Sequence, residues 1–294
     1  MIELDINQKD YPELLRNIKN PPKKLYILGN IDNLKKTKIS IIGSRAASQM
    51  GMKRAKEFSK ELASNGICIV SGMAKGIDSA AHWGSLLEKG RTIAVLASGF
   101  NNIYPRENKF LYDEILANKG CIISEYKPDE KPESYKFIQR NRIVSGLSRG
   151  VLVVEAAYRS GTSITAKFAT QQNRKVYCLP HNIEETNGVG TNRLIKNGAI
   201  LVTKPEEILK ELNIVKNSKS IKQEQVEYSK SNISFENMDN ETKEIFRTLA
   251  KEELTVNQLA LKLNKDISVI NILITKMELD GLIIQESDRL KINI

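Results

Sequence analysis

Short apolar runs alternate with longer amphipathic stretches along most of the chain. Several short runs are continuous, such as Ile-Ser-Ile-Ile at 39–42 and Val-Leu-Val-Val at 151–154. Continuous apolar strands are typical of a parallel sheet that is covered on both faces. The runs predict strands at 38–42, 67–70, 92–96, 121–124, 151–154, 176–179 and 199–202. The amphipathic stretches predict helices at about 51–65, 77–89, 106–118, 138–148, 162–173 and 191–197.

This alternation of strand and helix predicts an α/β fold, with a Rossmann-like, doubly wound and mostly parallel sheet over 38–212. Residues 1–37 form a short segment before it. A doubly wound sheet binds its ligands at the carboxyl ends of the strands, in the crevice where the strand order reverses. Ligand-binding residues are therefore expected in the loops that directly follow the predicted strands.

The pattern changes after residue 212. Residues 213–235 are rich in Asn, Ser, Lys, Gln and Glu and hold few apolar positions, which is typical of a linker. Residues 236–294 predict a small winged-helix-like domain, with two short strands around 287–289. Its helices are expected at about 240–251, 255–264 and 268–280, with Thr255 and Ser268 as N-caps and Gly281 at the end of the third.

The net charge of +10 favours a polyanionic partner. Residues 236–294 hold 8 Lys and Arg against 11 Asp and Glu, a net of −3, so residues 1–235 carry +13. A winged helix usually contacts DNA through its last helix, but here that helix offers only Lys276 beside Glu278 and Asp280. Because an acidic surface binds phosphate poorly, we expect a protein-interaction or packing role for this part rather than transcriptional DNA recognition.

The chain shows no sign of export or of membrane insertion. Residues 1–11 are polar and charged, and no run of 18 apolar residues occurs. Cys68, Cys121 and Cys178 lie far apart in apolar runs without CxxC spacing, which favours buried thiols over a disulfide or zinc site. A cytoplasmic protein without a membrane partner is expected.

The first candidate loop is Gly43-Ser44-Arg45, between a predicted strand and a predicted helix. A glycine turn at a helix N-terminus lets a phosphate approach the backbone, and Arg45 adds a forked charged donor. A turn glycine beside a surface arginine is an equally open interpretation of this loop taken alone.

The second loop, 71–78, places Ser71, Gly72, Lys75 and Gly76 between the next strand and its helix. Asp78 is expected to cap that helix, with ligand binding as the alternative. His82, beside two alanines, is expected to be a packing residue rather than a catalyst.

The third loop, 160–165, brings Gly161, Thr162 and Ser163 to the start of a further helix. Hydroxyls and free N–H groups at a helix N-terminus suit phosphate, and simple capping by Ser160 or Thr162 is the alternative.

A basic segment at 135–142 contains Lys136, Phe137, Arg140, Asn141 and Arg142. Arginines two positions apart cannot face the same way on a helix, so one is expected to meet the ligand and the other a carboxylate such as Glu155. Phe137 is expected either to stack a base or to lie in the core.

Three loops of one chemical kind, each after a sheet strand, indicate a multi-phosphate or polynucleotide site. The glycine spacing matches neither the dinucleotide fingerprint nor the P-loop, so NAD and ATP are not indicated and no cofactor is expected.

Together these motifs resemble the DprA/Smf family of bacterial DNA-processing proteins, over about residues 38–203. The residues that carry the resemblance are Gly43-Ser44-Arg45, 71–78 with Ala81-His82, 104–108, Ser124-Glu125, 137–142, 146–148, 161–166, 190–192, Leu194-Ile195 and Gly198-Ala199. The chain departs from the family pattern at 180–182, where His181 and Asn182 follow Pro180, and in its short segment before the first loop.

The resemblance implies a homodimeric, non-enzymatic protein that binds single-stranded DNA without strong sequence preference. It implies further that the protein loads RecA and displaces single-strand binding protein during natural transformation. By position, Gly43, Ser44 and Arg45 resemble part of the family's DNA pocket, and Lys136 and 140–142 lie where further contacts are expected.

An enzyme is the alternative. The region 150–166 is also similar to nucleotide hydrolases of the cytokinin-activating LOG type, which cleave an N-glycosidic bond, with Glu155 near Gly161-Thr162. The full glycine-rich signature of those enzymes is missing from this chain.

Overall fold

The computed structural model describes residues 1–88, 91–158, 160–214, 239–249, 252–279, 282–286 and 288–292. The chain divides into two compact units, Met1–Lys216 and Asn217–Ile294. Most of the predicted linker lies outside the described residues, as do Gly281 and Ser287. Among the residues described, no helix is both long and apolar enough to cross a membrane.

The large unit is built on one nine-stranded sheet with the strand order β1-β2-β6-β5-β4-β3-β7-β8-β9. The strands β3 to β9 run parallel to one another, whereas β2 pairs antiparallel with both β1 and β6. The strands are β1 Ile2–Asp5, β2 Lys24–Gly29, β3 Lys38–Ile42, β4 Cys68–Ser71, β5 Thr92–Val95, β6 Cys121–Ser124, β7 Gly150–Val153, β8 Lys175–Cys178 and β9 Ile200–Leu201. The predicted doubly wound, mostly parallel sheet is confirmed.

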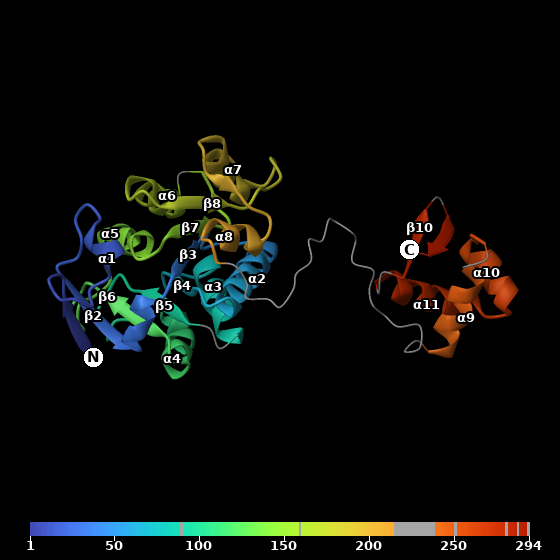
Figure 1. Ribbon diagram of the computed structural model, residues 1–294, viewed down its shortest axis with the longest axis horizontal. Helices are drawn as coiled ribbons and strands as arrows, with labels where there is room; N and C mark the ends of the chain where they lie inside the picture. The colour runs from blue at the N-terminus through green and yellow to red at the C-terminus, as the bar shows by residue number, and fades with distance from the viewer. Residues whose placement is uncertain are drawn as a thin grey trace. The chain divides into compact units, whose positions relative to one another are not determined.

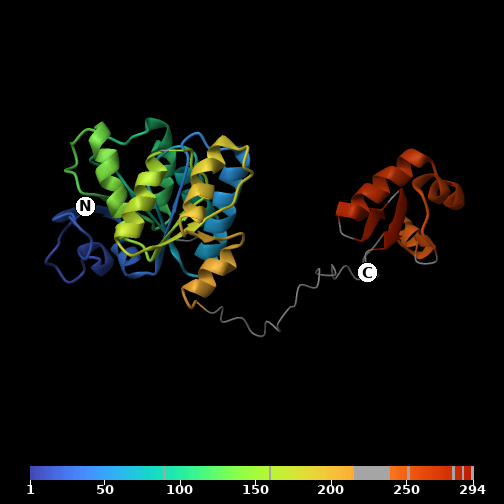
Figure 2. The ribbon, with the colours of Figure 1, turned by 90° about the horizontal axis from the view of Figure 1, so that it is seen from above.

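Helices cover both faces of this sheet (Figures 1 and 2). Alternate residues of the strands point to opposite faces, so Ile39 and Ile41 pack with Phe58 and Leu62, while Ile42 packs with Val144 and Leu147. The helices are α1 Glu13–Arg16, α2 Gln49–Ser64, α3 Ile77–Leu87, α4 Lys109–Ala117, α5 Ser134–Gly146, α6 Gly161–Gln171, α7 Val189–Lys196 and α8 Pro205–Glu211. Short 3-10 turns lie at Ile31–Lys35, Arg106–Asn108 and Thr186–Gly188. All three cysteines are buried free thiols, as expected.

The boundary expected at residue 38 is corrected by the structure. Strands β1 and β2 lie within 1–37 and extend the same sheet, because Tyr26 and Ile27 pair with Ser124 and Ile123 of β6. Residues 1–37 therefore belong to the large unit. The antiparallel hairpin covers the edge that β6 would otherwise expose.

The C-terminal unit contains α9 Asn240–Leu249, α10 Val256–Leu263, α11 Ile267–Leu279 and the hairpin of β10 Ile283–Glu286 with β11 Arg289–Ile292. It has a core of its own, which includes Ile245, Leu259 and Ile270. Three helices followed by a hairpin match the expected order, and the winged-helix assignment stays a prediction. Thr255 caps α10, as expected. Helix α11 starts at Ile267, and the side chain of Asp266 accepts a hydrogen bond from the backbone amide of Ser268, so Ser268 is not the N-cap.

Candidate nucleic-acid interface

Three loops meet at the carboxyl edge of the sheet, where the strand order reverses between β3 and β7. With the start of α5, these loops after β3, β4 and β7 enclose a pocket of about 600 Å³. Nine of the predicted residues line it: Gly43, Ser44, Arg45, Gly72, Phe137, Arg140, Asn141, Gly161 and Thr162. A hollow of about 230 Å³ shares Arg45, Phe137 and Arg140 and adds Lys75. The two hollows together form the Arg45 pocket.

Arg45 is an exposed cation of this pocket. Its guanidinium carbon lies 5.4 Å from the centre of the Phe137 ring, within the range of a cation–π contact. Phe137 is half-buried and meets Tyr104 edge to face, with ring centres 5.4 Å apart. No carboxylate of the described residues lies within 4.0 Å of Arg45. A charged donor and two accessible aromatic rings are therefore available to a ligand here.

The first and second loops pack directly against each other. Gly76 precedes α3 with φ of 76°, a conformation that favours glycine, and a Cβ at this position would lie 2.4 Å from the carbonyl oxygen of Ser44. The amide of Ile77 donates to that same carbonyl at 3.2 Å. The Gly43-Ser44-Arg45 turn is thus held on one side by the loop after β4.

A layer of buried charged groups lies beneath the pocket. A Cβ at Gly72 would lie 2.3 Å from the Arg140 guanidinium and 2.5 Å from the Asp78 carboxylate, so a side chain at this position would displace these charged groups. Burial lowers the pKa of Arg140, and the Asp78 charge opposes this shift. Burial raises the pKa of Asp78, and the Arg140 charge opposes it. The two groups therefore stabilise each other under the loop.

His82 is buried beside this layer and is a packing residue, as expected. Its Nε2 donates to the carbonyl of Gly72 at 2.6 Å, and its Nδ1 lies 2.7 Å from the Thr92 hydroxyl. Burial lowers the pKa of His82 to about 4, so the ring is neutral near pH 7. The expected cap at Asp78 is wrong, because Gly76 holds the N-cap position and Asp78 is turned into the buried layer.

The third loop opens on the pocket through the start of α6. Gly161 and Thr162 line the pocket, whereas Ser163 lies 3.5 Å from the Ser160 hydroxyl and outside the lining. The N-cap Ser160 makes no side-chain cap hydrogen bond, so simple capping does not account for this loop. Asn141 reaches the loop from α5, with its amide 3.5 Å from the Gly161 carbonyl.

Several predicted residues are already bound within the protein. Ser71 is buried and donates to the Ile41 carbonyl at 2.6 Å. Lys136 is 3% exposed and pairs with Glu130 and Glu133 at 3.2 and 3.0 Å. Their side chains offer no free group to a ligand.

Arg140 and Arg142 of α5 have partners other than those expected. Arg142 forms a bidentate pair with Glu125, with both N–O distances 2.7 Å, so the carboxylate expected at Glu155 is instead Glu125. Arg140 is 5% exposed and donates to the Val95 carbonyl. Lys75 is exposed and pairs with Glu107 at 2.7 Å.

Tyr104 and Thr165 line the pocket but were not among the predicted site residues. Tyr104 follows β5, at the same carboxyl edge as the other loops, and its position after that strand was the available signal. Thr165 lies one helical turn beyond Gly161, so it shares the face of α6 that meets the pocket.

The region that matches a known family coincides closely with the large unit. The family model for DNA recombination-mediator protein A matches residues 3–213. DNA processing protein DprA of Streptococcus pneumoniae is 43% identical over 68% of this chain and 71% of its own length. Protein Smf of Escherichia coli is 45% identical over 69% of this chain but only 54% of its own length, so the chain spans about half of this relative.

Two solved structures are similar to about 70% of this chain. DprA of Streptococcus pneumoniae has a TM-score of 0.69 at 41% identity and covers 71% of this chain and 74% of its own. DNA processing protein A of Helicobacter pylori has a TM-score of 0.64 at 33% identity and covers 70% and 94%. The fold, the loops of the Arg45 pocket and the match over 3–213 agree: the chain belongs to the DprA/Smf family of DNA-processing proteins.

Proposed function

We propose that the protein binds single-stranded DNA in the Arg45 pocket, without catalysing a reaction on it. The observation that carries this proposal is the pairing of an exposed Arg45 with the Phe137 ring where three phosphate-type loops meet. Proteins that bind single strands combine cationic groups for the backbone with aromatic rings on which bases stack. A duplex hides its base faces, so this combination favours a single strand.

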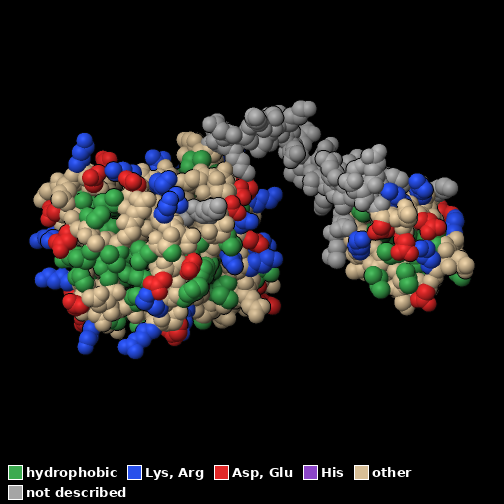
Figure 3. Space-filling model, turned by 90° about the horizontal axis from the view of Figure 1, so that it is seen from below, with side chains coloured by type: hydrophobic (Ala, Val, Ile, Leu, Met, Phe, Trp, Pro, Cys, Tyr) green, Lys and Arg blue, Asp and Glu red, His purple; other side chains and the backbone are tan. Residues whose placement is uncertain are grey.

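The relatives support the ligand class. The Helicobacter pylori structure is described by the single-stranded DNA binding mode of that protein, and it shares 33% of its residues with this chain over the aligned part. The charge supports it as well, because residues 1–235 carry +13. On the face shown in Figure 3, Lys and Arg side chains project along the edge of the large unit, around a more hydrophobic centre.

The finer part of the proposal concerns partners. We propose that the protein acts as a homodimer that loads RecA onto the bound strand and displaces single-strand binding protein during natural transformation or recombination. This part rests on membership of the family. It is tested by RecA filament assembly on a strand precoated with single-strand binding protein. The protein should shorten the lag, and Arg45→Glu should not.

The geometry does not favour the hydrolase alternative. That reaction needs Glu155 and Gly161-Thr162 in one cavity, but the Glu155 carboxylate lies in a different cavity, with Ser48 and Asn187. Hydrogen bonds from Ser48 and Asn187 also occupy this carboxylate. Release of free base from nucleoside monophosphates would be required to revive the alternative.

Fluorescence anisotropy of a labelled single-stranded oligonucleotide tests the proposed function. Unlabelled single strand should compete well and the matching duplex poorly. If about six phosphates are neutralised, the log–log salt slope should lie near −4. Binding that is insensitive to salt, or stronger competition by the duplex, would contradict the proposal.

A further inference from the structure

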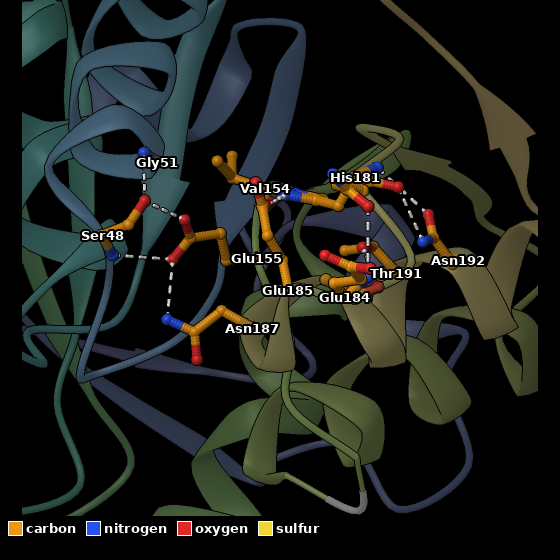
Figure 4. Close-up of polar contacts among 12 residues, drawn as sticks. Ser48, Gly51, Val154, Glu155, His181, Glu184, Glu185, Asn187, Thr191 and Asn192 are labelled. Atoms are coloured by element: carbon orange, nitrogen blue, oxygen red, sulfur yellow. Dashed lines mark hydrogen bonds and ion pairs between the residues drawn. The ribbon is translucent and has the colours of Figure 1, made fainter.

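Glu155 is a buried carboxylate at the carboxyl end of β7 that the Arg45 pocket does not use. It is 2% exposed, and the backbone amide of Ser48 donates to it at 3.0 Å. The Ser48 hydroxyl donates to its other oxygen, and Figure 4 shows Glu155 between Ser48 and Asn187. Glu155 therefore anchors the end of the loop that carries Arg45.

Ser48 transmits this anchor to α2. Its hydroxyl accepts the amide of Gly51 at 2.9 Å and so caps the helix. A Cβ at Gly51 would lie 2.2 Å from a Glu155 oxygen, so the carboxylate packs directly on the first turn. The position of Glu155 thus sets where the loop ends and where α2 begins.

Asn187 ties the same loop from a third segment. Its side-chain amide donates to the carbonyl of Ala46 at 2.9 Å, next to Arg45, and lies 3.4 Å from Glu155. Its backbone carbonyl accepts the amide of Ala156 at 2.7 Å. One residue therefore joins the loop after β3 to the end of β7.

The segment 181–190 holds Asn187 in place. His181 donates from Nε2 to the Val154 carbonyl at 2.7 Å, and the amide of Gly190 donates to the Ala156 carbonyl at 2.7 Å (Figure 4 labels His181 and Val154). Both ends of the segment are thus bound to the end of β7. The start of the Arg45 turn is held separately, at Ser44, by Gly76 and Ile77.

We propose that Glu155 and Asn187 are positioning residues for Arg45. Neither residue lines the Arg45 pocket, and both bind the end of the loop at 46–48, whereas Gly76 packs against Ser44. The segment 181–190 consequently controls the affinity of the pocket for single-stranded DNA. This inference rests on the proposed function, because it takes Arg45 as a DNA contact.

A double-mutant cycle in the full chain tests the inference, with anisotropy of a labelled single-stranded oligonucleotide as the readout. Asn187→Ala removes one hydrogen bond to the loop and should weaken binding by about 3- to 10-fold. In the Arg45→Ala background the same substitution should cost less than about twofold, because coupled residues are not additive. An equal fold-loss of affinity in both backgrounds would indicate a merely structural role and would overturn the inference.

Asn65→Ala is the matched control. Asn65 is the same residue type at the far end of α2, and its side-chain amide bonds to Glu61 and not to the Arg45 loop or to the segment 181–190. It should leave affinity within about twofold. An effect as large as that of Asn187→Ala would contradict the specific role of Asn187.

A conservative variant tests the role of the Glu155 oxygens. Glu155→Gln keeps one oxygen for the Ser48 amide and should retain most of the binding that Glu155→Ala loses.

If an Asn187 variant does not fold, Ser48→Ala is measured in the same cycle. If Arg45→Ala binds normally, the proposed function and this inference both fail. If Arg45→Ala weakens binding but Asn187→Ala does not, only this inference fails.

Discussion

The Arg45 pocket has an exposed rim, with Arg45 and Phe137, and a buried floor, with Arg140 and Asp78. Rim and floor use the same residue type, arginine, for different purposes. On the rim, Arg45 is exposed and lies over the Phe137 ring. On the floor, Arg140 is buried beside Asp78 and supports the glycine loop above it. Of the two arginines that line the pocket, one is thus available to a ligand and the other supports the loop. Exposure, and not residue type, distinguishes the arginine that we propose to contact DNA from the arginine that supports the loop.

Arg140→Met is expected to have the largest effect, on stability. Removing one partner leaves the buried Asp78 charge unpaired, which should cost about 3–5 kcal/mol of unfolding free energy. Urea denaturation measures it. The double variant with Asp78→Asn should recover part of the loss. A cost below about 1 kcal/mol would show that Arg140 is not a scaffold residue.

His82 should make the folding stability of the protein sensitive to acid. Because burial lowers its folded pKa to about 4, while the unfolded ring titrates near 6.5, the unfolded state binds the extra proton between these values. Stability should therefore fall by about 3 kcal/mol as the pH drops from 6.5 to 4. Denaturation across this range compares the protein with His82→Gln, which keeps a donor for Gly72. Equal slopes would contradict the assignment.

Arg45→Glu should act on affinity and leave stability unchanged. The reversal removes one phosphate contact and adds repulsion, which should weaken single-strand binding on the order of 30-fold. Lys36→Glu is the matched control, because it makes the same charge change before β3, at the opposite edge of the sheet. Equal losses in the two variants would mean that overall charge, and not the pocket, determines binding.

Phe137→Ala should remove the stacking surface of the rim. Without the stack of one base on this ring, binding should weaken on the order of tenfold, and Phe137→Tyr should retain it. Anisotropy at one fixed salt concentration measures both variants. If the two bind equally badly, the ring packs rather than stacks.

Removal of the C-terminal unit should have the smallest effect. The face shown in Figure 3 carries acidic and basic side chains side by side, and Lys276 of α11 pairs with Asp239 at 3.1 Å. A chain that ends at residue 214 should therefore bind single strands within about twofold of the full chain. A loss above tenfold would move part of the DNA site to this unit.

Much of the sheet could be predicted because buried parallel strands are continuously apolar. The prediction omitted β2, although Leu-Tyr-Ile-Leu at 25–28 is such a run and could have been used. Its antiparallel pairing with β6 was not predictable, because the two strands lie almost a hundred residues apart in the chain. The short α8 was omitted as well, although Pro205 at its start was a usable signal.

The site was predictable where its residues follow a strand directly, as Arg45 and Gly72 do. It was not predictable where a charge is neutralised by a distant partner. Glu125, which binds Arg142, lies 17 positions away. Glu133 lies only three positions before Lys136, so helical spacing could have predicted that pair.

The salt dependence of single-strand binding by the protein and by Arg45→Ala tests the central claim most directly. If Arg45 contacts one phosphate, the log–log slope of the variant should be shallower by about 0.7, with the melting temperature unchanged. Parallel lines of equal affinity would contradict the account, because they would show that DNA does not meet the protein at Arg45.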